Sequence, residues 1–268
     1  MRFPIVMGIL NVTSDSFSDG GRFLDPDEAV RHGLEMADAG AGIIDIGGES
    51  TRPMAQPVAP DAQKDRILPV IRELVKRVDC PISVDTRSAE VAAAALEAGA
   101  SIVNDVSGFL FDPQMPVILA KYRPIAIAMH MRGIPENMRD QTDYNAVLWD
   151  VSTELMQGAM KAVNAGLPFE NIWLDPGIGF AKTAEQSLIL LANLRFFKAL
   201  SRPVVVGPSR KSFLQQTTGK PVEQRLWGTA AAVSWAVSAG ADCVRVHDVK
   251  EMCDVVETIR ALMEACIV

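Results

Sequence analysis

The sequence predicts a single-domain (β/α)8 barrel spanning residues 1–268, and two observations support this fold. Eight short apolar runs, rich in Ile and Val, are separated by helical patterns of roughly ten to twenty residues. The junctions between elements also recur: a helical run ends at Ala-Gly, and the next apolar run ends in polar side chains. Eight strand–helix units are typical of this barrel. A doubly wound open sheet is the alternative, because alternation alone does not prove closure.

The predicted strands are apolar on both faces, as buried parallel strands are. In chain order they are 5–10, 43–47, 82–85, 102–105, 125–130, 172–175, 203–207 and 243–247. The segments "DAGAGIIDIGG" (38–48), "EAGASIVNDVSG" (97–108) and "SAGADCVRVHDV" (238–249) lead into the second, fourth and eighth strands. "NAGLPFENIWLDPG" (164–177) leads into the sixth strand through a longer turn. Runs such as "DEAVRHGLEMADA", "AEVAAAALEA" and "AAVSWAVSA" supply the intervening helices.

Composition excludes several classes of protein. The formal net charge is -7, and no basic block indicates nucleic-acid binding. Apolar stretches are interrupted well before the ~18 residues of a membrane helix. The four cysteines show no CxxC spacing, so they indicate reduced thiols of a cytoplasmic protein; they are Cys80, Cys243, Cys253 and Cys266. Three widely separated histidines make a zinc site improbable.

Polar residues follow every predicted strand. In order they are Asn11, "GGESTR" (47–52), Asp85, Asn104, His130, Asp175, "GPSRKS" (207–212), and Arg245 with His247. In a barrel the active site lies at these carboxyl ends, so a dense polar site is predicted there.

Some of these residues have structural interpretations as well. Asp85 can cap the following helix, although Ser88 or Thr86 is better placed to do so. Asp175 can stabilise the turn of "PGIGF". Of Asn104 and Asp105, only one faces the barrel interior, because neighbouring strand residues point to opposite faces. For His130, a core role and a site role are equally supported.

The cations among the strand ends favour a bound anion. "GPSRKS" places two cations and two hydroxyls just past a strand. Arg245 and His247 stand two apart, on one face of a strand, which suits phosphate or diphosphate. With Arg52 and Lys211, three separate positions supply positive charge to an acidic protein.

A series of motifs then connects the chain to a known family. "MGILNVTSDSFSDGG", "GGESTRP", "SVDT", "NDVSG", "MHMRG", "LDPGIGFAKT", "SRKSF" and "VRVHDVKE" occur in this order over nearly the whole chain. Together they closely resemble the dihydropteroate synthases of the folate pathway, the sulfonamide targets. The resemblance implies a (β/α)8 barrel and a homodimer. It also implies Mg²⁺-dependent condensation of 7,8-dihydropterin-6-ylmethyl diphosphate with 4-aminobenzoate.

The resemblance assigns roles residue by residue. It places the pterin ring against Asp85, Asn104, Val106, Met129, Asp175, Phe180, Gly207, Lys211 and Arg245. It places the diphosphate against Asn11, Thr51, Arg52, Arg245 and His247, with Asn11 as the Mg²⁺ ligand. It places 4-aminobenzoate against Phe17, Pro53, Lys211 and Ser212, and makes His130 structural. The catalytic set is Lys211, Asp175, Arg245 and Asp85.

The implied mechanism is an SN1-like cleavage, since an electron-rich dihydropterin delocalises a developing cation. That cation needs protection from water, so the loop carrying Asp15 and Phe17 is expected to act as a substrate-ordered lid. The sequence departs from the family pattern at Met54, at Ala181, where Gly is frequent, and at the variable position Pro208.

Other functions leave distinguishable signatures. Corrinoid-linked methyltetrahydrofolate transferases would not need the "SRK" lysine or the "STR" loop, both present here. An inactive pterin-binding paralogue would have lost one of Asn11, Arg52, Lys211 or His247, all of which are retained. A Schiff-base aldolase acting through Lys211 would be trapped by borohydride.

Overall fold

The computed structural model describes residues 4–13, 25–51 and 55–266. Within them, eight parallel strands form one sheet in the order β6-β5-β4-β3-β2-β1-β8-β7. The strands are β1 (Ile5–Asn11), β2 (Ile43–Gly47), β3 (Ile82–Asp85), β4 (Ile102–Asp105), β5 (Ile125–Met129), β6 (Ile172–Asp175), β7 (Val205–Val206) and β8 (Cys243–Val246). A parallel bridge between Leu174 and Val204 joins the two ends of this sheet. The barrel is therefore closed, and the open-sheet alternative is wrong.

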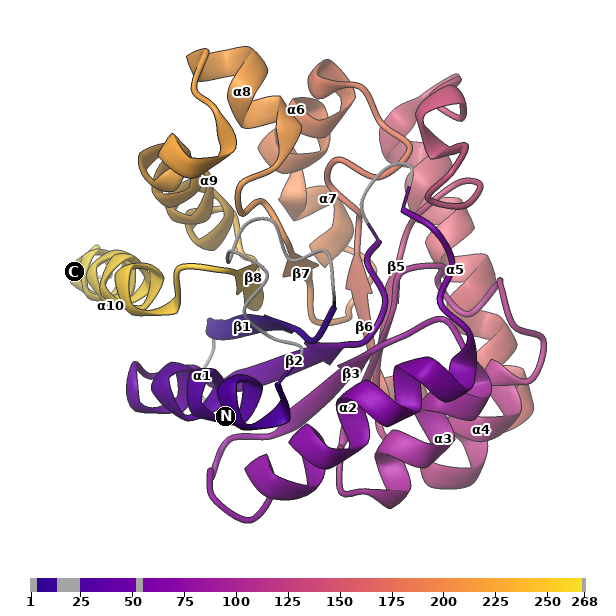
Figure 1. Cartoon of the computed structure of the whole chain (residues 1–268). Helices are drawn as coiled ribbons and strands as arrows, with labels where there is room; N and C mark the ends of the chain where they lie inside the picture. Colours follow the sequence, from indigo (N-terminus) through magenta and orange to yellow (C-terminus); the bar gives the residue numbers. More distant parts are fainter. Residues whose placement is uncertain (1–3, 14–24, 52–54, 267–268) are drawn as a thin grey trace.

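Helices surround the strands, as Figure 1 shows. The α-helices are α1 (Pro26–Asp38), α2 (Pro60–Leu74), α3 (Ala89–Glu97), α4 (Met115–Tyr122), α5 (Val147–Ala165), α6 (Ala184–Ala192), α7 (Leu194–Lys198), α8 (Ser212–Thr218), α9 (Leu226–Ser238) and α10 (Val249–Ala265). Three short 3₁₀ turns lie at Met138–Asp140, Phe169–Asn171 and Val222–Gln224. Helix α1 begins with Asp25 as its N-cap, and α6 begins with a capping box at Thr183 and Gln186.

The barrel interior changes from apolar to polar along the strands. One buried cluster fills its lower part with residues from seven of the strands: Ile5, Met7, Ile43, Ile102, Ile127, Trp173, Val205 and Cys243. Two residues further along β2 and β8, the same inward face carries Asp45 and Arg245, and Asp85 at the end of β3 bonds to Arg245. A larger apolar cluster packs the outer face of the strands against the helices. The interior is thus a packed core that becomes chemically active only near its carboxyl end.

Strand β7 is shorter than the predicted 203–207. Pro203 has no N–H to donate, and the Val204 N–H donates to the Asp242 side chain at 2.7 Å instead of to a neighbouring strand. Strand β5 ends at Met129, one residue earlier than predicted, although the His130 N–H still donates to the Asp175 carbonyl at 2.9 Å.

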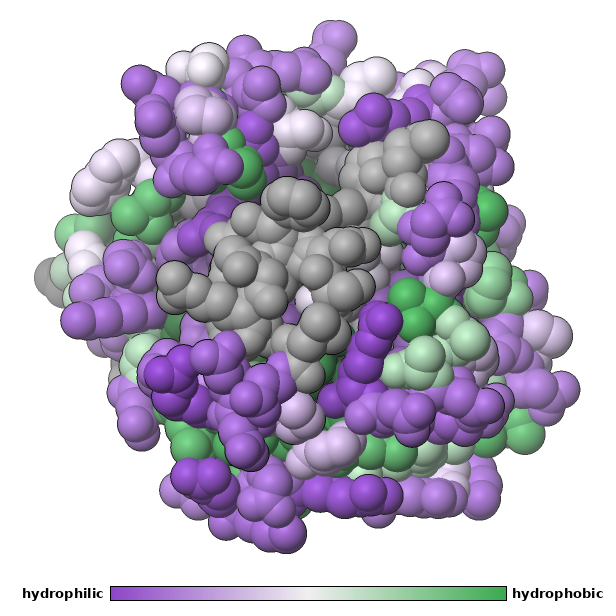
Figure 2. Space-filling view, viewed as in Figure 1, coloured by the Kyte–Doolittle hydropathy of each residue, from purple (hydrophilic) through white to green (hydrophobic). Residues whose placement is uncertain are grey.

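The outer surface is largely polar. In the view of Figure 2, hydrophilic residues cover most of the rim, and apolar residues appear in small groups between them. No helix in the described part of the chain is long and apolar enough to cross a membrane.

Candidate active site

The carboxyl ends of the strands surround a cleft of about 890 Å³. Among the predicted site residues, Asn11, Thr51, Asp85, Phe180, Gly207, Lys211, Ser212, Arg245 and His247 line it. A narrow slot beside the cleft is lined by Asn104, Val106, Met129 and Asp175, and it shares Thr51, Phe180, Gly207, Lys211 and Arg245. The described residues of the predicted set thus all meet at one mouth. Phe17, Arg52 and Pro53 lie outside the described residues, as do Asp15 and Met54.

Arg245 spans the top of the barrel interior between two carboxylates. Its Nε donates to Asp45 Oδ2 at 2.6 Å, and its Nη2 donates to Asp85 Oδ2 at 2.7 Å. Asn104 Nδ2 also donates to Asp45 Oδ2, at 3.0 Å. Two charge-assisted bonds from separate strands fix the plane of the guanidinium group.

Asp45 is a site residue that the sequence analysis missed. It is fully buried in β2 and lies two residues before the end of that strand. The search considered only the strand ends, and Asp45 falls inside an apolar run. The missed signal is a charged residue at an inward-facing position of a strand that is otherwise entirely apolar, because such a charge requires a buried partner.

Asp85 lines the cleft, and one of its two carboxylate oxygens is not used in a hydrogen bond within the described structure. Its Oδ1 is buried and has no hydrogen-bond partner among the described residues. Burial raises the pKa of Asp85 to about 7; Arg245 opposes this rise and Asp45 adds to it. The capping interpretation of Asp85 is wrong, because Ser88 Oγ caps α3 by accepting from the Val91 N–H.

Asp175 combines the two roles that the sequence left open. Its Oδ1 accepts from the Gly177 N–H at 2.7 Å, which shapes the turn after β6, and its side chain also lines the slot. Burial raises the pKa of Asp175 to about 6, while the Gly177 hydrogen bond and Lys211 act against that rise.

Asn104 and Asp105 face opposite sides of β4, as the strand geometry requires. Asn104 points inward to Asp45. Asp105 holds the following turn instead, accepting from the backbone N–H groups of Ser107 and Phe109. The residue of the pair that lines the slot is therefore Asn104.

Lys211 and Phe180 form the wall between cleft and slot. Lys211 Nζ lies 3.7 Å from the centroid of the Phe180 ring, a cation–π contact. Burial lowers the pKa of Lys211 to about 7, and the neighbouring Arg245 acts in the same direction. The second cation of "GPSRKS", Arg210, instead pairs with Asp248, its Nε donating at 3.1 Å.

The opposite end of the cleft has hydroxyl, amide and imidazole groups. His247 Nδ1 lies 3.0 Å from Ser209 Oγ, and Asn11 and Thr51 line the same cleft. Among the described residues, no group of three or more His, Cys, Asp or Glu side chains is arranged to hold a metal ion. Mg²⁺ commonly takes some of its ligands from the phosphate oxygens of a bound substrate.

Glu49 bonds to both sides of the loop that carries Thr51. The sequence analysis missed Glu49. Its Oε1 accepts from the Val58 N–H at 3.0 Å, and its Oε2 lies 3.4 Å from Arg87 Nε. Both side chains are buried. Glu49 thus connects the two ends of the segment 49–58 and fixes it to the first residues after β3.

Three comparisons place this geometry among known proteins. The family model of pterin-binding enzymes matches residues 7–247. The dihydropteroate synthase of Synechocystis is 46% identical over 258 residues, 96% of this chain and 89% of that protein.

Solved structures match the whole barrel. The Yersinia pestis dihydropteroate synthase, solved with a sulfonamide drug, superposes with a TM-score of 0.94 at 39% identity, covering 98% of this chain and 95% of that one. The Xanthomonas albilineans enzyme, solved with 4-aminobenzoic acid, superposes with a TM-score of 0.91 at 40% identity, covering 98% and 94%.

A closed (β/α)8 barrel with Asp85, Asn104 and Asp175 at its carboxyl mouth, matched by that family model, defines a pterin-binding enzyme. Within that class, the chain belongs to the dihydropteroate synthase family and is a transferase. The resemblance drawn from its motifs is confirmed.

Proposed function

We propose that the chain condenses 7,8-dihydropterin-6-ylmethyl diphosphate with 4-aminobenzoate, giving 7,8-dihydropteroate and diphosphate, in a Mg²⁺-dependent reaction. The observation that carries the assignment of the site is the Asp85 oxygen without a partner among the described residues, in the cleft beside a slot that is lined by Asn104 and Asp175. An aminopyrimidine edge presents adjacent N–H donors, and buried carboxylates and an amide are the acceptors it requires.

Arg245 is suited to lie on the face of the pterin. Asp45 and Asp85 hold its guanidinium plane before any substrate arrives. A planar cation fixed in this way stacks on a flat ring without losing further side-chain freedom. Met129, Val106 and Phe180 supply the apolar remainder of the slot.

The diphosphate belongs at the other end of the cleft, with Asn11, Thr51 and His247. Arg52 is expected to join them from outside the described residues. Asn11 offers a hard amide oxygen for Mg²⁺, whose other ligands would come from the diphosphate and water. When bound, Mg²⁺ would stabilise negative charge on the leaving diphosphate.

The chemistry follows from the bond that breaks. The bond between the pterin methylene and the diphosphate oxygen cleaves, and its electron pair leaves with the diphosphate. The buried carboxylate of Asp175 favours the positive charge that develops on the ring. The aniline nitrogen of 4-aminobenzoate then bonds to the methylene carbon and loses one proton. Lys211 and Ser212, with Phe17 and Pro53 from outside the described residues, would hold 4-aminobenzoate.

The test is release of diphosphate by the purified protein. Release should require both substrates and Mg²⁺, and Lys211→Ala should reduce it by at least about 100-fold if the lysine contacts both substrates. The matched control is Lys198→Ala, which removes a lysine paired with Asp242 and remote from the cleft. Release without 4-aminobenzoate, or near-normal turnover by Lys211→Ala, would contradict these assignments.

The chain is also proposed to act as a cytoplasmic homodimer. Its four cysteines are free, which suits a reducing compartment. Helix α9 exposes the large side chains of Trp227 and Trp235. Such an apolar helix face is typical of an interface between subunits.

A further inference from the structure

The turn that follows β6 carries Phe180 in an unusual backbone conformation. Gly177, Gly179 and Ala181 all have positive φ angles, of 69°, 80° and 48°. Ala181 occupies a left-handed conformation that glycine adopts more easily. Within the turn the Phe180 N–H donates to the Gly177 carbonyl at 3.1 Å, and contacts from other elements then help to determine where the Phe180 ring stands.

Lys182 provides contacts of this kind from inside the protein. Its side chain is 8% exposed, and its Nζ lies 2.8 Å from the Phe180 carbonyl oxygen. Nζ also lies 2.9 Å from His130 Nδ1 and 3.3 Å from the His130 carbonyl oxygen. An ammonium group has three N–H donors, and these three acceptors match them.

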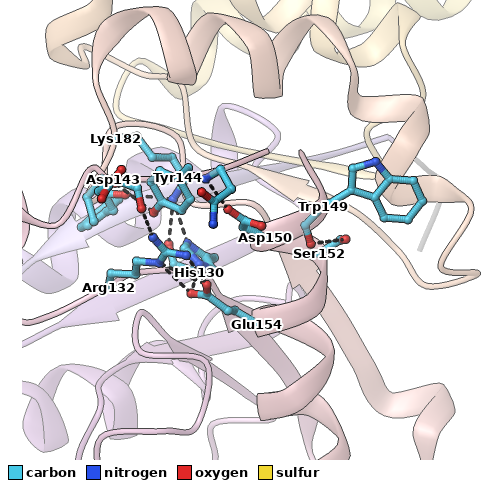
Figure 3. Close-up of polar contacts among 12 residues, drawn as sticks. His130, Arg132, Asp143, Tyr144, Trp149, Asp150, Ser152, Glu154 and Lys182 are labelled. Atoms are coloured by element: carbon cyan, nitrogen blue, oxygen red, sulfur yellow. Dashed lines mark hydrogen bonds and ion pairs between the residues drawn. The ribbon is translucent and has the colours of Figure 1, made fainter. Parts of the chain in front are cut away.

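A second layer holds His130 in turn. His130 Nε2 lies 2.9 Å from Glu154 Oε2 on α5, as Figure 3 shows. A carboxylate only accepts, so Nε2 carries the hydrogen and Nδ1 is left to accept from Lys182. Burial and the nearby Lys182 lower the pKa of His130 to about 4, which agrees with a neutral ring. This is the structural role that the family resemblance implied for His130.

The same network of side chains also bonds to Ala181, the next residue of the turn. Glu154 also pairs with Arg132, whose guanidinium carbon lies 3.9 Å from the centroid of the Tyr144 ring. The Tyr144 hydroxyl donates to the Ala181 carbonyl at 2.9 Å. Two successive carbonyls, of Phe180 and Ala181, are therefore bonded to side chains of one network.

We propose that Lys182 is a positioning residue for the second substrate: it fixes the turn so that the Phe180 ring stands against Lys211 between slot and cleft. The proposal rests on the assignment of Phe180 and Lys211 to the substrate sites. The pterin has strand-borne partners in Asp85 and Asn104, which bond Arg245 and Asp45 rather than this turn. Lys211, which is proposed to hold 4-aminobenzoate, stands directly against the Phe180 ring, so this substrate loses more when the turn relaxes.

The variant Lys182→Met tests this, since it keeps the apolar stem and removes all three donors. The KM for 4-aminobenzoate should rise roughly tenfold, the effect of losing hydrogen bonds from a charged donor. The Kd of the dihydropterin diphosphate, measured by calorimetry, should stay within about twofold. Lys198→Met is the control for loss of a lysine ion pair outside the site, and both values should remain at wild-type level.

Tyr144→Phe is the second variant, and it removes only the hydroxyl bonded to Ala181. It should raise the same KM by about threefold, the size of one neutral hydrogen bond. If Lys182→Met does not fold, Tyr144→Phe decides alone. An unchanged KM in Tyr144→Phe, or equal effects of Lys182→Met on both substrates, would overturn the proposal. Absence of diphosphate release by the wild type would instead refute the proposed function.

Discussion

At the scale of single residues, the site depends on carboxylates buried before any ligand is present. Asp45 makes no predicted contact with substrate, yet it bonds both Arg245 and Asn104. Taking two charges out of water costs free energy, and close bonds recover only part of it. The pair of Asp45 and Arg245 is better explained by orientation of the guanidinium group than by stability of the fold.

Asp175 makes the stability of the empty enzyme depend on pH. Its folded pKa is about 6, against 3.8 for the ordinary carboxyl, so between these values the folded state binds more protons than the unfolded state. The contribution of Asp175 to the free energy of unfolding is fully present below pH 3.8 and is lost as the pH rises through 6. Asp175→Asn removes that loss and keeps an acceptor for Gly177.

The free energy of unfolding of Asp175→Asn, relative to wild type, should therefore increase between pH 4 and pH 8 by about 1–3 kcal/mol. Urea unfolding at the two pH values measures it. A relative free energy that is constant, or that falls with pH, would show that Asp175 is not held above its ordinary pKa.

At the scale of elements, the contacts of Glu49 with Val58 and Arg87 form a clasp that joins the two ends of the segment 49–58. Replacing only Glu49 by an apolar residue would leave Arg87 buried without a carboxylate. The double variant Glu49→Ala/Arg87→Met removes both charges, and with them the contacts that form the clasp. Because Thr51 lies in this segment, the KM for the dihydropterin diphosphate should rise about tenfold while the fold is kept.

Glu49→Gln is the matched control for that experiment. It retains an oxygen for the Val58 N–H, so its KM should remain within about threefold of wild type. Steady-state kinetics and limited proteolysis of the segment report the two effects. A double variant with the wild-type KM would show that the clasp does not position Thr51.

An element could be predicted from the sequence when the residues that determine it are close together in the chain, and not when they are far apart. The apolar runs and Ala-Gly junctions predict the strands because a buried strand and a helix end are local requirements, and the site residues at strand ends follow from the barrel. Asp45, Glu49 and Lys182 escaped prediction because their partners are distant in sequence: Asp45 meets Arg245 from the far end of the chain. The shortened β7 depends likewise on Asp242.

At the scale of the whole molecule, the proposed dimer would cover an apolar area on one side of the barrel. Trp227 is 80% exposed and Trp235 is 55% exposed on α9, and α10 beside it exposes Leu262 and Met263. Trp227→Glu should shift the protein toward monomer by at least about tenfold in Kd, since a desolvated tryptophan commonly dominates an interface.

Sedimentation equilibrium measures that shift, and Val117→Glu on α4 is the control. Val117 is 54% exposed, and Figure 1 places α4 on the opposite side of the barrel from α9. Equal dissociation of both variants, or of neither, would argue against an interface at α9.

The closure of the barrel between β6 and β7 has a further consequence. One bridge joins these strands among the described residues, so this is where the cylinder is most easily parted. Asp175 follows from one side of that junction, and Gly207 and Lys211 follow from the other. A pterin that contacts residues after both β6 and β7 would connect the two strands at the point where the barrel is most easily opened. Binding and closure are then linked, and the backbone amides of Leu174 and Val204 should exchange hydrogen more slowly in the occupied enzyme than in the empty one.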